Sequence, residues 1–149
     1  MKAAVYRGKQ TLSVEDIPTP EPGPGQVLVK VKYSAICGTD VHAFLYDIPP
    51  PGTVLGHEFS GTVTQVGPRV SAWQEGDRVV SGIGAPPPGK GPGYLTNPRY
   101  NYRTMGFPAG QIKGYAEYVL MEEWQPTRIP DGVDDRAAAL TEPCGVAVR

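Results

Sequence analysis

The sequence predicts a mainly β fold with short helices, in which many short strands form a small, partly open barrel with one or two helices at its edge. Glycine (19 residues) and proline (17 residues) are abundant, and the apolar residues, 40% of the 149, stand in short alternating runs between Gly- and Pro-rich clusters. Such clusters are typical of turns, and such runs are typical of half-buried strands. The length suits one hydrophobic core of ordinary domain size.

The strands and helices are expected in a regular order along the chain. In the clearest strand, 26–36, valines 27, 29 and 31 and Tyr33 alternate with Leu28, Lys30 and Lys32, a period of two that indicates one buried and one solvated face. The other expected elements are strands at 2–6, 12–17, 58–66, 78–80 and 114–121, and helices at 38–46 and 134–140. Asp134 or Asp135 is the expected N-cap of the last helix, and Pro143 either ends it or lies early in a new one.

Charge and cysteine content exclude several classes of partner. The 14 Lys and Arg against 15 Asp and Glu give a formal net charge of −1, so no net positive field is available to hold a nucleic acid. No stretch approaches the roughly 20 apolar residues of a membrane span, and the first residues lack the apolar core of a secretory signal. We therefore expect a cytoplasmic protein with neither nucleic-acid nor membrane partners. In that compartment Cys37 and Cys144 are more often buried, ligating or catalytic than disulfide-bonded.

The segment 81–113 differs from the rest of the chain. It holds six prolines, seven glycines, four basic residues and no acidic one. A loop of this length without regular structure is usually functional or mobile. We interpret this segment as a subunit contact, as a lid that favours an acidic substrate, or as a solvated segment. Its tyrosines and cations also match a single-stranded nucleic-acid patch, which we consider less favoured.

Side chains that bear on catalysis occur in three separate segments. Thiolate, imidazole and carboxylate groups are the ligands that zinc prefers, and a catalytic zinc needs about three of them plus an open position. Any one of these residues alone has an ordinary structural explanation, so only the combination indicates a metal site. The residues are Cys37, Thr39 and His42 after the strand at 26–36, His57 and Glu58 further along, and Glu142 with Cys144 near the end.

The residues from Gly56 onward resemble a known signature. They read Gly-His-Glu, two residues, Gly61, five residues, Gly67, two residues, Val70. This run resembles the zinc signature of the medium-chain dehydrogenases, the zinc alcohol dehydrogenases and their relatives. The runs at 37–42, 76–79 and 114–118 are similar to that family's catalytic domain in the same order, and the resemblance covers essentially the whole chain. The Cys-Gly-Thr-Asp-Val-His run and the late Glu-Pro pair are most similar to the polyol (sorbitol), glucose and threonine dehydrogenase branch.

The resemblance implies a GroES-like catalytic domain over residues 1–149. In the intact enzyme this domain would be joined to a Rossmann domain that binds NAD or NADP, and the enzyme would form a homo-oligomer. No Gly-x-Gly-x-x-Gly occurs here, because the run that begins at Gly82 meets Pro86 and cannot open a helix. The Rossmann domain is therefore expected to be absent from these residues, and the fragment alone is expected to be inactive.

The same resemblance implies the site. Cys37 and His57 would be zinc ligands, and Glu58 would lie beside the metal, able to coordinate it or to exchange with water. Either Glu142 or Cys144 would complete the set, and Glu142 is favoured because the Glu-Pro pair matches the polyol branch. Asp40 would accept a hydrogen bond from His57 and fix its tautomer. The lobe that binds a structural zinc in many relatives corresponds to 81–113, which has no cysteine, so one catalytic zinc and no structural zinc is expected.

The implied reaction is oxidation of an alcohol, polyol or hydroxy-amino acid. Zinc would bind the substrate hydroxyl and lower its pKa, and hydride would pass to the nicotinamide. Thr39 would take the proton, and His42, on the same helix face, would pass it to solvent. The alternative from another class is a non-enzymatic binding or assembly module on the same barrel. A zinc-free quinone reductase relative is disfavoured, since it would not need Cys37, His57 and Glu142 together.

Overall fold

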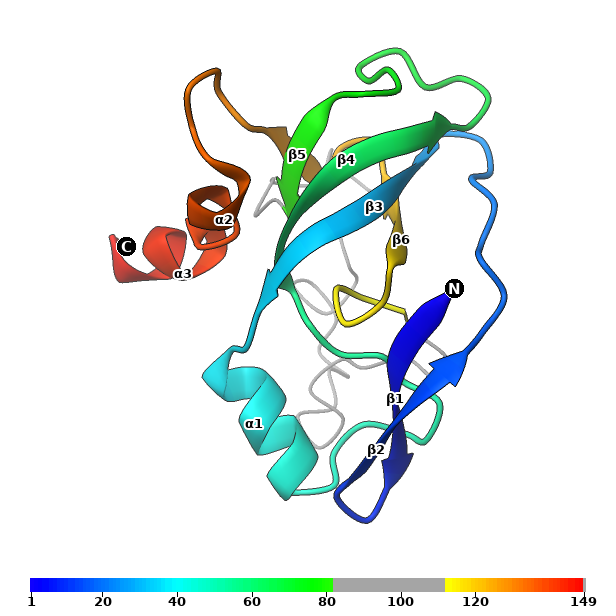
Figure 1. Ribbon diagram of the computed structural model, residues 1–149, viewed down its shortest axis with the longest axis vertical. Helices are drawn as coiled ribbons and strands as arrows, with labels where there is room; N and C mark the ends of the chain where they lie inside the picture. Colours follow the sequence, from blue (N-terminus) through cyan, green and yellow to red (C-terminus); the bar gives the residue numbers. More distant parts are fainter. Residues whose placement is uncertain (82–111, 149) are drawn as a thin grey trace, which may run out of the picture.

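The computed structural model describes residues 1–81 and 112–148, which form two antiparallel sheets with three short helices (Figure 1). Strands β1 (Lys2–Gly8) and β2 (Thr11–Asp16) form a hairpin. The second sheet has the order β6-β3-β4-β5-β7, and its edge strands β6 and β7 do not pair with each other in the described part of the chain. The remaining elements are β3 (Gln26–Ala35), α1 (Gly38–Leu45), β4 (Glu58–Val66), β5 (Arg78–Ser81), β6 (Tyr118–Glu122), β7 (Pro126–Arg128), α2 (Asp135–Ala138) and α3 (Thr141–Ala147).

This architecture confirms the predicted mainly β class with short helices, with a few local differences. The strand expected at 114–121 begins only at Tyr118, because residues 114 and 115 form a turn. Strand β7 was not predicted, since three residues are too short to show a period. Asp134 is the N-cap of α2, and Pro143 lies in the first turn of a separate helix, α3, where its missing N–H costs nothing.

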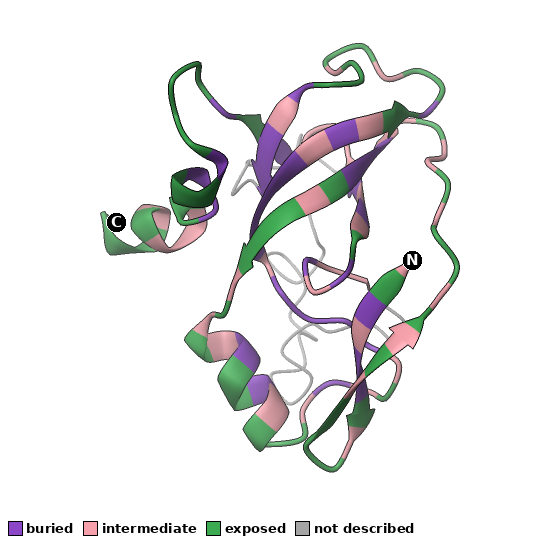
Figure 2. Ribbon diagram, in the orientation of Figure 1, coloured by how far each residue is buried: buried purple, intermediate pink, exposed green. Residues whose placement is uncertain are grey.

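The largest buried cluster of the described residues is built on the larger sheet, and Figure 2 marks buried stretches along β3 and β4; smaller clusters lie at β1, at α1 and between β5 and α2. Val27 and Val29 are buried as the alternation predicts, but Leu28, expected on the solvated face, is only 2% exposed, and Tyr33, expected on the face of the valines, is 41% exposed. The β3–β4 register shifts between Val31 and Tyr33, and such an irregularity moves the following side chains to the other face. The buried members of this cluster are Val27, Val29, Phe59, Val63, Val79, Val119 and Met121.

Gly61 sets how closely β4 approaches β3. It pairs with Val31 in the middle of the ladder, and a Cβ built on it would lie 2.3 Å from the carbonyl oxygen of Lys30. Any side chain at this position would therefore push the two strands apart. The same ladder pairs Ala35, the last residue of β3, with Glu58, the first residue of β4.

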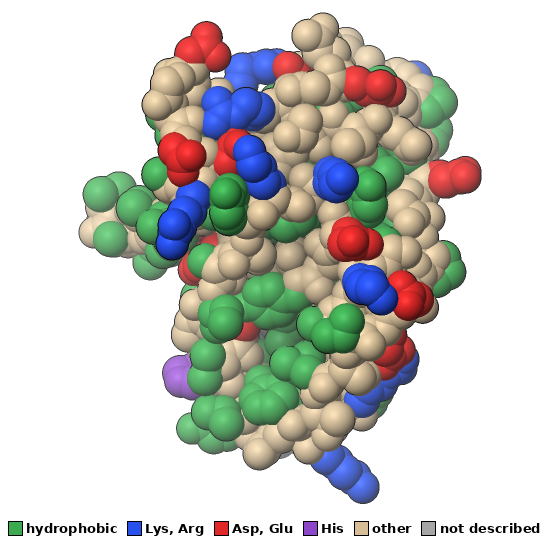
Figure 3. All heavy atoms as spheres, viewed as in Figure 1, with side chains coloured by type: hydrophobic (Ala, Val, Ile, Leu, Met, Phe, Trp, Pro, Cys, Tyr) green, Lys and Arg blue, Asp and Glu red, His purple; other side chains and the backbone are tan. Residues whose placement is uncertain are grey.

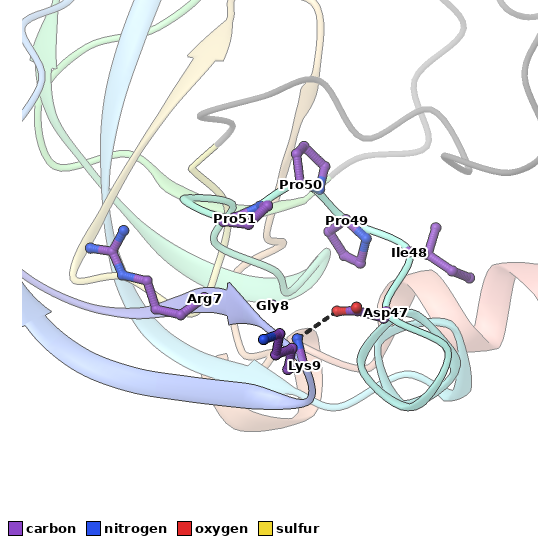
Figure 4. A pocket seen from close by; sticks show the side chains of 8 residues that line it. All are labelled: Arg7, Gly8, Lys9, Asp47, Ile48, Pro49, Pro50 and Pro51. Carbon is purple, nitrogen blue, oxygen red and sulfur yellow. Dashed lines mark hydrogen bonds between the residues drawn. The ribbon is translucent and has the colours of Figure 1, made fainter.

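The hairpin turn and the segment after α1 meet at Asp47, as Figure 4 shows. Lys9, Gln10 and Asp47 all have positive φ, and the Lys9 N–H donates to the Asp47 carboxylate at 2.7 Å. The hydroxyl of the fully buried Tyr6 also contacts that carboxylate. Prolines 49–51 and Arg7 help to line a hollow of about 640 Å³ beside this turn, and none of the predicted site residues lines it.

Charged side chains of both signs are mixed on the face seen in Figure 3. Ion pairs of the described residues include Lys2–Asp16, Arg7–Glu15 and Arg128–Asp77. Among the described helices, none has the length or the apolar run that crossing a bilayer requires.

Asp135 fastens α2 to the sheet. Its carboxylate lies 2.5 Å from the Lys32 ammonium on β3 and 2.7 Å from the Arg78 guanidinium on β5. The Ser60 hydroxyl on β4 donates to the Asp135 carbonyl at 2.6 Å. Because α3 follows α2 directly, these contacts also fix where the Glu142-bearing helix starts.

We expect Asp135→Asn to lower the free energy of unfolding by about 1–2 kcal/mol near neutral pH, because two ion pairs with Lys32 and Arg78 are replaced by contacts of these cations with a neutral amide. The bonds from Lys32, and then those from Arg78, hold the pKa of Asp135 below its usual range, although burial opposes them. A lowered carboxyl pKa stabilises the fold above the unfolded value of about 3.9 and is lost as pH falls through the folded pKa. Urea unfolding should therefore show the two proteins converging below about pH 4. Exposed Asp131→Asn is the control, and a constant gap down to acid pH would contradict the assignment.

Candidate metal centre

Three of the predicted ligands meet where β3 ends and β4 begins. A ligand atom from each of Cys37, His57 and Glu58 lies within 4.8 Å of the other two. The Ala35–Glu58 pairing explains this convergence, because Cys37 follows β3 while His57 and Glu58 open the adjacent antiparallel strand. The sheet register therefore brings residues far apart in the sequence close to one another.

Cys37 is the N-cap of α1. Its sulfur accepts a hydrogen bond from the Thr39 N–H at 3.4 Å, while its own N–H donates to the Asp40 carboxylate at 3.2 Å. This reciprocal arrangement is a capping box, with cysteine in the place usually taken by serine or threonine. The helix start thus holds the Cys37 backbone and directs its half-buried thiol toward His57 and Glu58.

Gly56 provides the turn that presents His57. Its φ is +93°, and a Cβ on it would lie 2.6 Å from the Tyr115 ring. Only glycine adopts this backbone without strain, and only glycine leaves room for the ring. The first residue of the Gly-His-Glu run is therefore needed for geometry, and the next two supply the chemistry.

The Asp40 carboxylate joins the parts of the site together. It is only 3% exposed and accepts hydrogen bonds from the Gly56 N–H at 3.2 Å and the Tyr115 hydroxyl at 2.9 Å, besides that of Cys37. Its Oδ1 lies 3.5 Å from Nδ1 of His57, as expected from the sequence. Engagement of Nδ1 leaves Nε2 as the nitrogen available to a metal.

These contacts shift the protonation of both partners. The contact with Asp40 raises the pKa of His57, burial opposes it, the Lys113 charge lowers it, and the Glu142 charge raises it. Burial raises the pKa of Asp40, but the contacts from His57, Tyr115 and the Cys37 N–H together outweigh it, so the net pKa lies below the ordinary value. Since a metal binds only neutral imidazole, protons compete with it increasingly as pH falls through the raised His57 pKa.

The burial of the Glu58 carboxylate indicates that a cation fits this site. The residue is 4% exposed, and one oxygen of its carboxylate lies within 4.8 Å of ligand atoms of Cys37 and His57. A buried carboxylate is costly unless it is paired or coordinates a metal. Donors on one tetrahedral zinc lie roughly 3.5 Å apart, so shifts of about 1 Å would close the shell. The sulfur, nitrogen and oxygen donors present here fit zinc.

Glu142 and Cys144 both lie on α3, outside the described group of three. Glu142 is half-buried in the first turn, and its charge reaches His57, whereas Cys144 is exposed. Thr39 is half-buried in the first turn of α1, next to the Cys37 sulfur. His42 is exposed one turn later, with its ring 5.9 Å from that of Tyr46.

The sequence predicts no role for Tyr115, which lies in the run 114–118 that resembles the family. Its hydroxyl donates to Asp40, and it also lies 3.2 Å from the Ala35 carbonyl. A tyrosine hydroxyl is a possible hydrogen-bond donor, but nothing in the sequence places residue 115 beside residue 40. The structure therefore adds Tyr115 as a residue that positions Asp40 and, through it, His57.

We expect Tyr115→Phe to weaken zinc binding by about tenfold, because Asp40 loses a donor that fixes its orientation toward His57. The ring that packs on Gly56 is kept, so the fold should remain. Competition with a chromophoric chelator measures the zinc dissociation constant. Tyr118→Phe on β6 is the matched control, and equal constants for the two variants would remove Tyr115 from this role.

Comparisons with known proteins identify the family of this domain. The alcohol dehydrogenase GroES-like domain matches residues 23–131. L-threonine 3-dehydrogenase of Rhizobium etli (strain CIAT 652) is 40% identical over 99% of this chain and 45% of its own length, and sorbitol dehydrogenase of Halalkalibacterium halodurans is 40% identical over 96% and 43%.

Solved structures extend the likeness to three dimensions. 2R,3R-butanediol dehydrogenase from Bacillus subtilis superimposes with a TM-score of 0.78 at 31% identity, over 99% of this chain and 45% of its own. Acetophenone reductase from Geotrichum candidum, in complex with NAD, gives 0.74 at 32% identity over 94% and 43%. This chain thus spans about 45% of the length of such relatives. It belongs to the medium-chain zinc alcohol dehydrogenase family, of which it represents the GroES-like domain.

Proposed function

We propose that this chain is the catalytic domain of a zinc-dependent dehydrogenase that oxidises a small alcohol, polyol or hydroxy-amino acid with NAD or NADP. The convergence of Cys37, His57 and Glu58 within 4.8 Å is the observation on which the proposal rests. The names of the similar threonine, sorbitol and butanediol dehydrogenases support the substrate class. The nicotinamide-binding part would belong to sequence outside these 149 residues, and the intact enzyme would be a homo-oligomer.

The side chains of this domain would hold the metal and move the proton. Zinc, when bound, would supply Lewis-acid chemistry that lowers the pKa of the substrate hydroxyl. Asp40 would hold His57 in the tautomer that leaves Nε2 free. Thr39, whose backbone N–H donates to the Cys37 sulfur, would relay the proton: its hydroxyl would accept it from the substrate hydroxyl while passing its own proton on, and the exposed His42 would deliver that proton to water.

Glu142 is the better candidate to complete the ligand set with Cys37 and His57, because Glu58 could exchange with water and so leave one position open. Its half-buried side chain acts electrostatically on His57, whereas the Cys144 thiol is exposed on the same short helix. Neither side chain belongs to the group of ligand atoms within 4.8 Å, so α3 would have to shift to bring either of them to the metal. We therefore assign Glu142 to the site and leave Cys144 outside it.

Metal analysis of the purified chain tests this proposal. We expect about one zinc per chain in the wild type and its loss in Cys37→Ser, because a thiolate ligand is replaced by a poor donor. Glu142→Gln should weaken zinc binding by at least tenfold. Cys144→Ser, which changes the only other thiol, is the matched control and should retain the metal.

Circular dichroism and thermal unfolding of each variant separate metal loss from misfolding. A folded wild-type chain that takes up no zinc would overturn the enzymatic proposal and favour a binding or assembly module. Loss of zinc in Cys144→Ser with retention in Glu142→Gln would reverse the choice between Glu142 and Cys144.

A further inference from the structure

Lys113 lies at the edge of the metal centre, although the sequence places it only at the end of a basic segment. Residues 114 and 115 run beside 55 and 56, since the Gly114 N–H donates to the Gly56 carbonyl at 2.7 Å and the Tyr115 N–H to the Leu55 carbonyl at 2.9 Å. Lys113 directly precedes this contact and His57 directly follows it. The two residues are therefore brought together by the backbone.

The Lys113 side chain is half-buried and acts on groups of the site. Its charge lowers the pKa of His57, and the Asp40 carboxylate in turn acts to raise the pKa of Lys113 against the lowering effect of burial. The backbone contacts and these charge interactions together place Lys113 beside the centre where a substrate hydroxyl would be bound. Electrostatic interactions are stronger there than at an open surface, because water is partly excluded.

The chemistry proposed above uses only the hydroxyl of the substrate and so leaves this cation without a part in the reaction. We propose that Lys113 determines specificity by binding an anionic group, a carboxylate or a phosphate, carried by the alcohol substrate. This inference rests on the proposed function, since it concerns the same site. An ammonium ion is a compact point charge that suits either anion.

The other role open to Lys113 is to offset the negative charge of Asp40, Glu58 and Glu142. The two roles predict different results. A residue that only balances charge would alter zinc binding when replaced, and it would leave the preference between charged and neutral ligands unchanged. A residue that binds the substrate anion would alter that preference in zinc-loaded protein.

Matched pairs of probes separate charge from shape. In one pair, 3-hydroxybutyrate and 3-hydroxybutyramide differ in a carboxylate against a neutral amide; in the other, glycerol 3-phosphate and glycerol differ by a phosphate. Dissociation constants are measured on the zinc-loaded chain by NMR titration for the wild type, Lys113→Met and Lys113→Arg. Lys30→Met on β3, which removes an exposed cation, is the control. Lys113→Gln replaces the Met variant if the latter loses its fold.

We expect the wild type to prefer the anionic member of one pair, and Lys113→Met to reduce that preference by about fivefold, the contribution of one partly exposed ion pair. Lys113→Arg and Lys30→Met should keep the preference, and the pair that responds identifies carboxylate or phosphate. An unchanged preference in zinc-loaded Lys113→Met, or no preference in the wild type, overturns the inference. Absence of zinc from the folded wild type, measured in the same samples, instead overturns the proposed function.

Discussion

The site depends on one buried carboxylate. Asp40 accepts hydrogen bonds from the start of α1, from the turn before β4 and from Tyr115 in the segment before β6, and it faces His57. A buried charge of this kind is tolerated only when several donors surround it. Each of these donors therefore stabilises the carboxylate, and the carboxylate in turn fixes three segments of the chain relative to one another.

The sheet determines where those segments start. Strands β3 and β4 pair so that the last residue of one faces the first of the other, and the chain leaves the sheet there on both sides. Cys37 and His57 thus lie at adjacent strand ends rather than on flexible loops. Ligands held by rigid elements need little reorganisation when a metal binds, which favours both affinity and a defined geometry.

Much of the fold and part of the site could be predicted from local patterns. Alternation of apolar residues predicted β3 and β4, and Asp134 marked the start of α2, because these signals depend only on neighbouring residues. The Cys37–His57–Glu58 cluster was predicted through family resemblance, since residue spacing alone does not state which strand ends meet. The positions of Tyr115 and Lys113 at the site were not predicted, because they depend on backbone contacts between the segments near residues 55 and 115. The exposure of Tyr33 follows from a register shift, and the alternation of apolar and polar residues does not predict such a shift.

Gly61 lies three residues beyond Glu58 and offers no donor atom, yet the distance between β3 and β4 depends on its lack of a side chain. Its replacement would spread the strand ends that present the sulfur, the imidazole and the carboxylate. A survey that ranked random substitutions by metal content would consequently place Gly61 among the coordinating residues. Melting temperatures measured on the same variants would distinguish positions such as Gly61, which act through the fold, from residues that donate an electron pair to the metal.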